Sequence, residues 1–279
     1  MEILHERYKT KSGMSVSHSS AKNPSDSEFE LHIHDRYEIL CTISGNVGYL
    51  VEGREYDMYP GSIILTRPAE THKLTVKGKG IYERYVLAFR ADDIKSLGFS
   101  EDILMAFNNR QLGEKNQYFS GEFVNISPES FFKEMMRQCT EGDTQTVILS
   151  NLAALLCSIN SAFLKKNTMD ATTTNNDVGK EILDYVNKNL TSEISLESVS
   201  AHVHMSPSQL NRIFRKMTGT SVYDYVLSKR LIMVQELISS GVGAVSASQR
   251  CGFGDYSSFY RVYKKRTGKA PASAKSKSV

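Results

Sequence analysis

The C-terminal third of the chain repeats one pattern of short helices, and this repeat constrains the fold more than any other feature. The segment IFRKMTG at 213–219 has a counterpart, VYKKRTG, at 262–268. A break in the helical pattern precedes each of them, at 204–207 (HMSP) and at 251–255 (CGFGD). A short helix, a tight turn and a second helix with an exposed basic face are typical of a helix-turn-helix. The sequence therefore predicts two such units in tandem.

Capping signals mark the helices of the first unit. Ser195 is a candidate N-cap of a short helix, and Ser206 can accept hydrogen bonds from the N–H groups of the next one. Pro207 needs no donor at the first helical position, and Gln209 completes a capping box. The second helix should bury an apolar stripe made of Leu210, Ile213, Phe214 and Met217.

A long helix over 222–239 is expected to join the two units. In the second unit, the helix that follows Asp255 should bury Phe259, Val262 and Tyr263. Its candidates for the exposed face are Ser257, Tyr260, Arg261, Lys264 and Lys265. Two units joined by one rigid helix could enter successive major-groove segments on one face of DNA.

The charge distribution agrees with this interpretation. Residues 178–279 carry 15 Lys+Arg and 7 Asp+Glu, a net charge of +8, whereas residues 1–177 carry 19 and 24, a net charge of −5. A basic end on an acidic body indicates that the end meets a polyanion. Duplex DNA is the partner that the helix pattern and the charge predict together.

The N-terminal part predicts a different architecture. Residues 29–89 contain short runs rich in β-branched and aromatic residues, separated by glycines and prolines, with no helix between them. This spacing favours an antiparallel sandwich or barrel. The strand runs are FELHIH, YEILCTIS, VGYLVEG, SIILT and YERYVLAF.

Two helices are predicted after the strands. One opens at Ser127-Pro128-Glu129 and ends near Thr140, and the other covers 143–166. On the second helix Ile148, Leu152, Leu155, Ile159 and Ala162 form a seam with coiled-coil-like steps. The seam could pack on the chain's own barrel, form a homodimer face, or do both. The polar segment 167–177 is the expected linker, which places a sensing and dimerisation domain at 1–166 and a DNA-binding domain at 178–279.

HIHDRYEIL at 32–40 raises the question of a metal or ligand site. On a strand, alternate residues share a face, so His32 and His34 would point the same way into a barrel lumen. Glu38 and His72 would have to come from neighbouring strands to complete a metal site. A metal site, a polar small-molecule pocket and a structural role are the three alternatives. We expect the small-molecule pocket, with no required metal and no other cofactor.

The C-terminal part resembles the DNA-binding domain of the AraC family of bacterial transcription regulators, over about Val178 to Pro271. The most specific segments are LESVSAHVHMSPSQLNRIFRKMTG, Arg230 in the connecting helix, and CGFGDYSSFYRVYKKRTGKAP. The resemblance implies base contacts by Ser208, Asn211 and Arg212 in the first unit and by Tyr256, Ser257, Tyr260 and Arg261 in the second. It implies phosphate contacts by Lys216, Lys264 and Lys265.

The N-terminal part resembles the cupin-like sensor domain of many family members, through HIHDRYEILCTISG and YPGSIILTRPAETHKL. The resemblance implies a multidomain protein: a cupin-like antiparallel β-barrel with trailing helices, followed by an all-α double helix-turn-helix. The positions that match the metal-binding cupin motif are His32, His34, Glu38, Gly45 and His72. The residues expected to line the ligand pocket are His32, His34, Tyr37, Glu38 and His72.

The expected function is a cytoplasmic, ligand-responsive transcription regulator. By analogy with family members the small-molecule effector would be a carbohydrate, and RNA polymerase would be a further partner. A second candidate function is a metal-dependent cupin enzyme with a helical appendage. A third is a constitutive DNA-binding protein whose barrel only forms the dimer. The sequence has no Gly-rich phosphate loop, no nucleophile elbow and no spare carboxylate pair, so we do not expect an enzyme. No apolar run approaches the roughly 20 residues of a membrane helix, so no membrane partner is expected.

Overall fold

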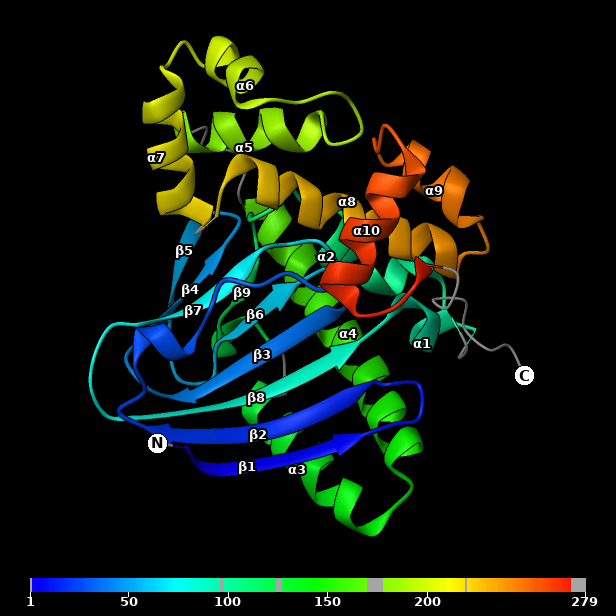
Figure 1. Ribbon diagram of the computed structural model, residues 1–279. Helices are drawn as coiled ribbons and strands as arrows, with labels where there is room; N and C mark the ends of the chain where they lie inside the picture. The colour runs from blue at the N-terminus through cyan, green and yellow to red at the C-terminus, as the bar shows by residue number, and fades with distance from the viewer. Residues whose placement is uncertain (1, 96–97, 124–126, 170–177, 219, 272–279) are drawn as a thin grey trace. The chain divides into compact units, whose positions relative to one another are not determined.

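The computed structural model describes residues 2–95, 98–123, 127–169, 178–218 and 220–271. They form two compact units, one built from the strands and the helices up to α4 and one from helices α5 to α10, with which residues 33–35 are grouped (Figure 1). The predicted linker at 167–177 lies mostly outside the described ranges, and α4 (Thr144–Met169) continues into its first residues.

The first unit contains two antiparallel sheets. The larger has the strand order β1-β2-β8-β3-β6-β9, and the smaller has the order β5-β4-β7. The larger sheet consists of β1 (Glu2–Lys9), β2 (Ser15–Lys22), β3 (Tyr37–Ser44), β6 (Ile63–Thr66), β8 (Ile81–Phe89) and β9 (Gln117–Tyr118). The smaller consists of β4 (Val47–Val51), β5 (Arg54–Met58) and β7 (His72–Val76). The predicted antiparallel β architecture is confirmed.

The alternation of side chains along β3 explains how this unit is layered. Ile39 and Cys41 enter a core shared with the helices, whereas Leu40 enters a second core shared with Val47 and Tyr49 of the smaller sheet. Successive residues of a strand point to opposite faces. Both faces of the larger sheet are therefore covered at its centre, and its strands are apolar on both sides.

The prediction of a strand at FELHIH, residues 29–34, is wrong. Only His32 pairs, through an isolated bridge to His72, while Asp26–Glu28 form a short 3-10 helix (η1). Residues 33–36 lead from this bridge to β3, which belongs to the other sheet, so the pairing cannot continue as a ladder. Five strands, β1, β2, β5, β7 and β9, were not predicted. The first four are rich in polar residues and lack the clear β-branched pattern, and β9 is only two residues long.

The helices that follow agree with the sequence patterns. α1 (Ala91–Lys95), η2 (Glu101–Leu104), α2 (Met105–Asn108) and η3 (Ser120–Glu122) are short, and α3 (Pro128–Glu141) begins after the N-cap Ser127. The predicted seam of α4 is buried in the core of its own unit. Packing on the chain's own sheet therefore accounts for the seam. The expectation that no apolar run approaches the length of a membrane helix is wrong, because Thr144–Lys166 of α4 is long and apolar enough, with a mean hydropathy of 1.9. The buried seam of this helix nevertheless forms part of the core.

The helices of the second unit form two cores that share one helix. Its helices are α5 (Val178–Lys188), α6 (Leu196–His202), α7 (Pro207–Thr218), α8 (Val222–Ser239), α9 (Ala244–Arg250) and α10 (Tyr256–Thr267). α5, α6 and α7 pack on the N-terminal half of α8, around Phe214 and Tyr225. α9 and α10 pack on its C-terminal half, around Val234 and Phe259. The predicted double helix-turn-helix is confirmed.

Candidate DNA interface and ligand site

The first helix-turn-helix is defined by two caps. Ser195 Oγ accepts a hydrogen bond of 3.1 Å from the backbone N–H of Ser198 at the start of α6, and Ser206 Oγ accepts one of 3.3 Å from Gln209 at the start of α7. His204 adopts the left-handed conformation in the turn between them, with φ of 53°. These local bonds satisfy N–H groups that the helix starts leave unpaired.

The exposed face of α7 follows from what the helix buries. Leu210 and Phe214 have no exposed surface, so the residues on the opposite side face outward. Of the predicted contacts, Ser208 and Arg212 are exposed, and Asn211 is half-buried, with its Oδ1 accepting a hydrogen bond of 3.4 Å from Arg215 Nε. Lys216 belongs to α7, but its side chain lies outside the described ones.

The second helix-turn-helix has the same construction. Asp255 caps α10, with its Oδ1 accepting a hydrogen bond of 2.7 Å from the backbone N–H of Ser258, and this bond lowers the pKa of Asp255. Phe259 and Tyr263 are buried. The predicted contact residues of α10 all lie off this buried face. Exposed are Ser257, Arg261, Lys264 and Lys265, and half-buried are Tyr256 and Tyr260.

Arg230 of α8 connects the two halves. Its Nε donates to the carbonyl oxygen of Leu190, its Nη2 to that of Ser192 and its Nη1 to that of Gly252, each at 2.6 Å. The first two carbonyls belong to the loop before α6, and the third belongs to the turn before α10. One guanidinium therefore holds a loop of each half on the same helix.

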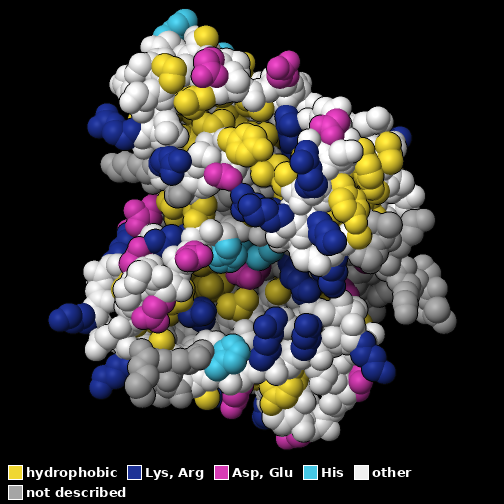
Figure 2. Space-filling view, in the orientation of Figure 1, with side chains coloured by type: hydrophobic (Ala, Val, Ile, Leu, Met, Phe, Trp, Pro, Cys, Tyr) yellow, Lys and Arg dark blue, Asp and Glu magenta, His cyan; other side chains and the backbone are white. Residues whose placement is uncertain are grey.

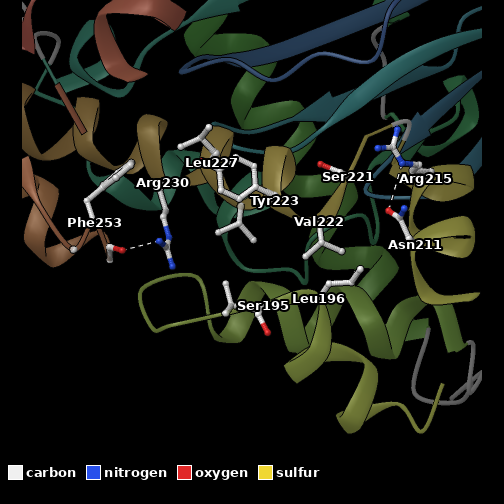
Figure 3. Close-up of a pocket in the computed structure, with 14 residues that line it drawn as sticks. Ser195, Leu196, Asn211, Arg215, Ser221, Val222, Tyr223, Leu227, Arg230 and Phe253 are labelled. Carbon is white, nitrogen blue, oxygen red and sulfur yellow. Dashed lines mark hydrogen bonds between the residues drawn. The ribbon is translucent and has the colours of Figure 1, made fainter. Parts of the chain in front are cut away.

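A pocket of about 520 Å³ runs along α8 between the two halves (Figure 3). Leu196, Val222 and Leu227 give it an apolar lining, with Asn211 and Arg215 near one end; Phe253 and Arg230 lie at the other end. In the space-filling view, hydrophobic side chains gather over the helical unit with Lys and Arg side chains beside them (Figure 2). Because Asn211 is a predicted base contact, the pocket opens beside the expected DNA interface.

The two histidines of HIHDRYEIL lie close to His72. The nitrogen atoms of His32, His34 and His72 that could bind a metal all lie within 4.8 Å of one another. Glu38 is connected to this cluster through Tyr49, whose hydroxyl donates to Glu38 Oε1 at 3.3 Å and whose ring stacks on His72 at 5.9 Å. Burial, followed by the charge of Glu38, raises the pKa of Tyr49, so its hydroxyl is a donor at neutral pH.

Tyr37 lies on the other side of the sheet. Its ring stacks on Phe89 at a centroid distance of 5.4 Å, and its hydroxyl donates to Asn108 Oδ1 at 3.3 Å. Adjacent residues of β3 point to opposite faces, so Tyr37 and Glu38 cannot share one pocket. The structure thus brings together the three predicted histidines, places Glu38 beside them through Tyr49, and leaves Tyr37 apart.

A buried ion pair supports the segment that carries His72, and sequence analysis did not identify it. Arg110 Nη1 and Nη2 donate to the two carboxylate oxygens of Glu70 at 2.6 and 2.8 Å, and both side chains have no exposed surface. Burial acts to raise the pKa of Glu70, but the charge and hydrogen bonds of Arg110 outweigh it, so this pKa lies below its usual value. No local pattern signals a pair whose members lie so far apart in the sequence.

Comparison with known proteins assigns a family to each part of the chain. Residues 19–105 match the model of the AraC-like ligand binding domain, and residues 199–277 match that of a helix-turn-helix domain. Two domains of this kind in this order define a DNA-binding transcription regulator with a ligand-binding domain. The chain belongs to the AraC family of such regulators.

Individual relatives agree with this assignment. The HTH-type transcriptional activator RhaS of Klebsiella pneumoniae is 24% identical over 274 residues, which cover 97% of this chain and 96% of the relative. The arabinose operon regulatory protein of Escherichia coli is 33% identical over 95 residues, covering 33% of this chain and 32% of the relative. Among solved structures, ToxT of Vibrio cholerae aligns with 95% of this chain and 97% of its own, at 15% identity and with a TM-score of 0.39.

Proposed function

We propose that the protein is a sequence-specific regulator that places α7 and α10 in successive major-groove segments of duplex DNA. The observation that carries this proposal is the pair of recognition helices with buried apolar faces and exposed polar faces, held on one helix by Arg230. An α-helix fits the major groove, where each base pair presents a distinct pattern of donors and acceptors. Two helices on one support can read two segments at a fixed spacing.

The exposed residues divide by chemistry into two groups. Arg212 and Arg261 can bind guanine with two parallel hydrogen bonds, as Arg does most often in specific contacts. Lys264 and Lys265 lie at the C-terminal end of α10 and are suited to phosphate as point charges. The proposed base contacts are Ser208, Asn211, Arg212, Tyr256, Ser257, Tyr260 and Arg261, and the proposed phosphate contacts are Lys216, Lys264 and Lys265.

The test is to select binding sites from random duplex DNA with the purified protein and then to measure affinity for the selected site. Arg212→Ala and Arg261→Ala should each cost about 1–3 kcal/mol and relax the preference at one or two positions. Arg54→Ala is the matched control, because it removes the same exposed charge from β5 of the other unit. If both recognition-helix variants bind like the control, with unchanged sequence preference, the assigned faces are wrong.

The N-terminal unit is proposed to bind a small-molecule effector that controls DNA binding. The polar cluster of His32, His34, His72 and Glu38 offers donors and acceptors that suit a polar ligand such as a carbohydrate. Thermal denaturation of the purified protein in the presence of sugars tests this, because a ligand that binds only the folded state raises its stability. If no sugar raises the unfolding temperature, the effector is not a carbohydrate.

We propose no catalytic activity, and no cupin enzyme, because the relative that spans 97% of the chain is a transcriptional activator. A cytoplasmic location and contact with RNA polymerase belong to the same proposal, as expected of a regulator of transcription. A cupin-like origin of the first unit is likewise proposed on the basis of its antiparallel sheets and its histidine motif.

A homodimer is proposed through the outer face of α4, since the inner face is used within the protomer. This outer face is uncharged along most of its length and includes Leu164, whose exposed fraction is 53%. The other exposed residues of α4 are Gln145, Thr146, Ser150, Ala154, Cys157, Ser161 and, at its C-terminal end, the charged Lys165. An exposed uncharged face on a long helix can pack against the same face of a second copy.

A further inference from the structure

The pocket along α8 belongs wholly to the helical unit. It is lined by 14 residues from α6, α7, α8 and the loops that precede α6, α8 and α10 (Figure 3). Its volume of about 520 Å³ lies within the range of about 300–1,000 Å³ that is usual for small-molecule sites. Of the proposed DNA contacts only Asn211 lines it, so DNA binding alone does not account for this pocket.

The lining of the pocket carries positive charge. Arg215 and Arg230 are its charged residues, and none of the 14 lining residues is Asp or Glu. Arg215 Nε donates to the amide oxygen of Asn211, and Arg230 donates to backbone carbonyls, so both guanidinium groups are paired with neutral acceptors. A wall with two cations and no carboxylate favours an anionic ligand.

The acidic residues next to the lining in the sequence do not cancel this charge. Asp224 Oδ1 accepts a hydrogen bond of 2.8 Å from Arg266 Nη2, which is outside the pocket, and Asp255 caps α10. Glu193 and Glu197 are exposed to solvent, where their charges are screened. These four acids therefore leave the positive charge of the wall largely uncompensated.

The two arginines differ in what they can offer a ligand. All three guanidinium nitrogens of Arg230 donate to carbonyl oxygens at 2.6 Å. Arg215 is exposed, and among the described residues only its Nε has a hydrogen-bond partner, at 3.4 Å. Its Nη1 and Nη2 can therefore donate to the two oxygens of one carboxylate, which is the strong and directional pairing of arginine with an acid. Arg215 is thus the residue suited to bind the charged end of a ligand.

The wall between the two arginines is apolar and partly aromatic. Leu196, Val222 and Leu227 lie there, and Phe253 lies near Arg230 at the far end (Figure 3). Tyr223 also lines the pocket, and its exposed fraction of 71% is the largest of any large hydrophobic side chain in the described residues. Aromatic rings bury much apolar area and prefer offset or edge-to-face contacts with one another. The apolar wall is therefore suited to an aromatic ring.

We propose that this pocket binds a small aromatic carboxylate, with the carboxylate on Arg215 and the ring on the apolar wall. The bound acid would occupy Arg215 and, through the hydrogen bond to it, constrain Asn211, which is a proposed base contact. Binding of the acid should therefore oppose binding of DNA, and the coupling must be reciprocal. Occupancy of the pocket does not depend on the proposed DNA-binding function, but its effect on DNA does.

The charge requirement can be tested with two molecules of nearly the same shape. The full chain, free of DNA, is titrated by calorimetry with 4-phenylbutyrate and separately with 4-phenylbutyramide. The amide keeps the ring and the carbon chain of the acid but has no charge. One equivalent of the acid should bind, and the amide should bind at least about tenfold more weakly, because it loses the charge-assisted hydrogen bonds.

Three variants locate the site within the chain, and circular dichroism verifies that each is folded. Arg215→Ala should weaken binding of the acid at least about tenfold. Tyr223→Glu should also weaken it, because it adds a negative charge to the wall at the start of α8, where a helix accepts an acidic residue. Arg250→Ala is the matched control, because it removes an exposed arginine of α9 outside the pocket, and it should bind like wild type.

A DNA titration keeps the two proposals distinguishable. Saturating 4-phenylbutyrate should lower the DNA affinity of the wild-type chain and leave that of Arg215→Ala unchanged, and no effect on wild type would overturn the coupling. A chain that binds the acid but no specific DNA would refute only the proposed function. The pocket proposal is overturned if the acid does not bind the wild-type chain, if the amide binds equally well, or if Arg215→Ala binds the acid as Arg250→Ala does.

Discussion

Arg230 Nη1 donates a hydrogen bond of 2.6 Å to the carbonyl oxygen of Gly252. This bond joins the middle of α8 to the turn that positions α10. Two further bonds from the same guanidinium reach the loop before α6, on the side of α7. The spacing of the two recognition helices therefore depends on the geometry of one side chain, and this dependence can be tested.

Arg230→Lys should weaken the helical unit and its binding to DNA. Lysine keeps the charge but lacks the planar fork that reaches three carbonyls at once. Because hydrogen bonds to charged groups contribute about 1.5–3 kcal/mol each, losing at least one should lower the free energy of unfolding by about that amount. Urea denaturation measures this, and binding to sites with altered half-site spacing shows whether discrimination of spacing falls. Unchanged stability and spacing preference would contradict the role given to Arg230.

Gly252→Ala should destabilise the protein more than Gly268→Ala does. Both glycines have positive φ, of 81° and 71°, so an alanine at either position costs about 1–2 kcal/mol of backbone strain. At Gly252 the added Cβ would also lie 2.7 Å from the carbonyl oxygen of Thr191, whereas at Gly268 it meets nothing within 4 Å. Thermal unfolding of the two variants isolates the steric contribution. Equal losses of stability would mean that the turn relaxes without cost.

Lys264→Ala should lower the affinity for all DNA sequences alike. A lysine on phosphate carries no sequence information, and its loss removes one released counterion. The slope of log K against log salt should therefore become less steep by about 0.9. Fluorescence anisotropy at several salt concentrations, on specific and random duplexes, measures both effects. A change confined to the specific duplex would reassign Lys264 to base recognition.

Arg110→Ala should destabilise the first unit strongly. It leaves the carboxylate of Glu70 buried without its partner, which typically costs about 3–5 kcal/mol. Arg137→Ala is the control, because its pairs with Glu134 and Glu141 are on the surface and should change stability little. Denaturant unfolding compares the two variants. A small effect of Arg110→Ala would show that water or a rearranged side chain replaces the pair.

The same pair predicts a loss of stability in acid. Because the pKa of Glu70 is lower in the folded chain than its usual value of 4.5, the folded state favours the ionised form. This stabilisation is present above pH 4.5 and is lost as the pH falls through the folded-state pKa below it. Glu70→Gln should therefore flatten the dependence of unfolding free energy on pH below 4.5. A parallel pH dependence in wild type and variant would exclude Glu70 as its source.

Substitutions at two leucines of α4 should affect folding and dimerisation separately. Leu152 has no exposed surface and belongs to the core, so Leu152→Ala should cost about 2–5 kcal/mol. Leu164→Glu alters only the outer face and should leave the fold intact while weakening a homodimer through that face. Sedimentation velocity and circular dichroism measure assembly and folding on the same samples. A folded Leu164→Glu dimer would move the proposed interface elsewhere.

Much of this protein could be predicted from local patterns. The helix over 222–239, the caps Ser127 and Ser195, and the strands YEILCTIS and SIILT follow from signals within a few residues. Capping, apolar periodicity and turn chemistry act over short distances, so the sequence contains them directly. The sequence alone thus determined that the chain carries tandem helix-turn-helix units behind an antiparallel β domain.

Tertiary structure decided which residues meet. His72 faces His32 because one backbone bridge pairs them, Tyr37 leaves the cluster because a strand alternates its faces, and the seam of α4 is buried by its own sheet. Arg110 and Glu70 pair across a long stretch of chain, as do Arg230 and Gly252. Such contacts depend on sheet register and chain crossings, which local sequence does not encode, because many distant partners are chemically equivalent until the fold selects one.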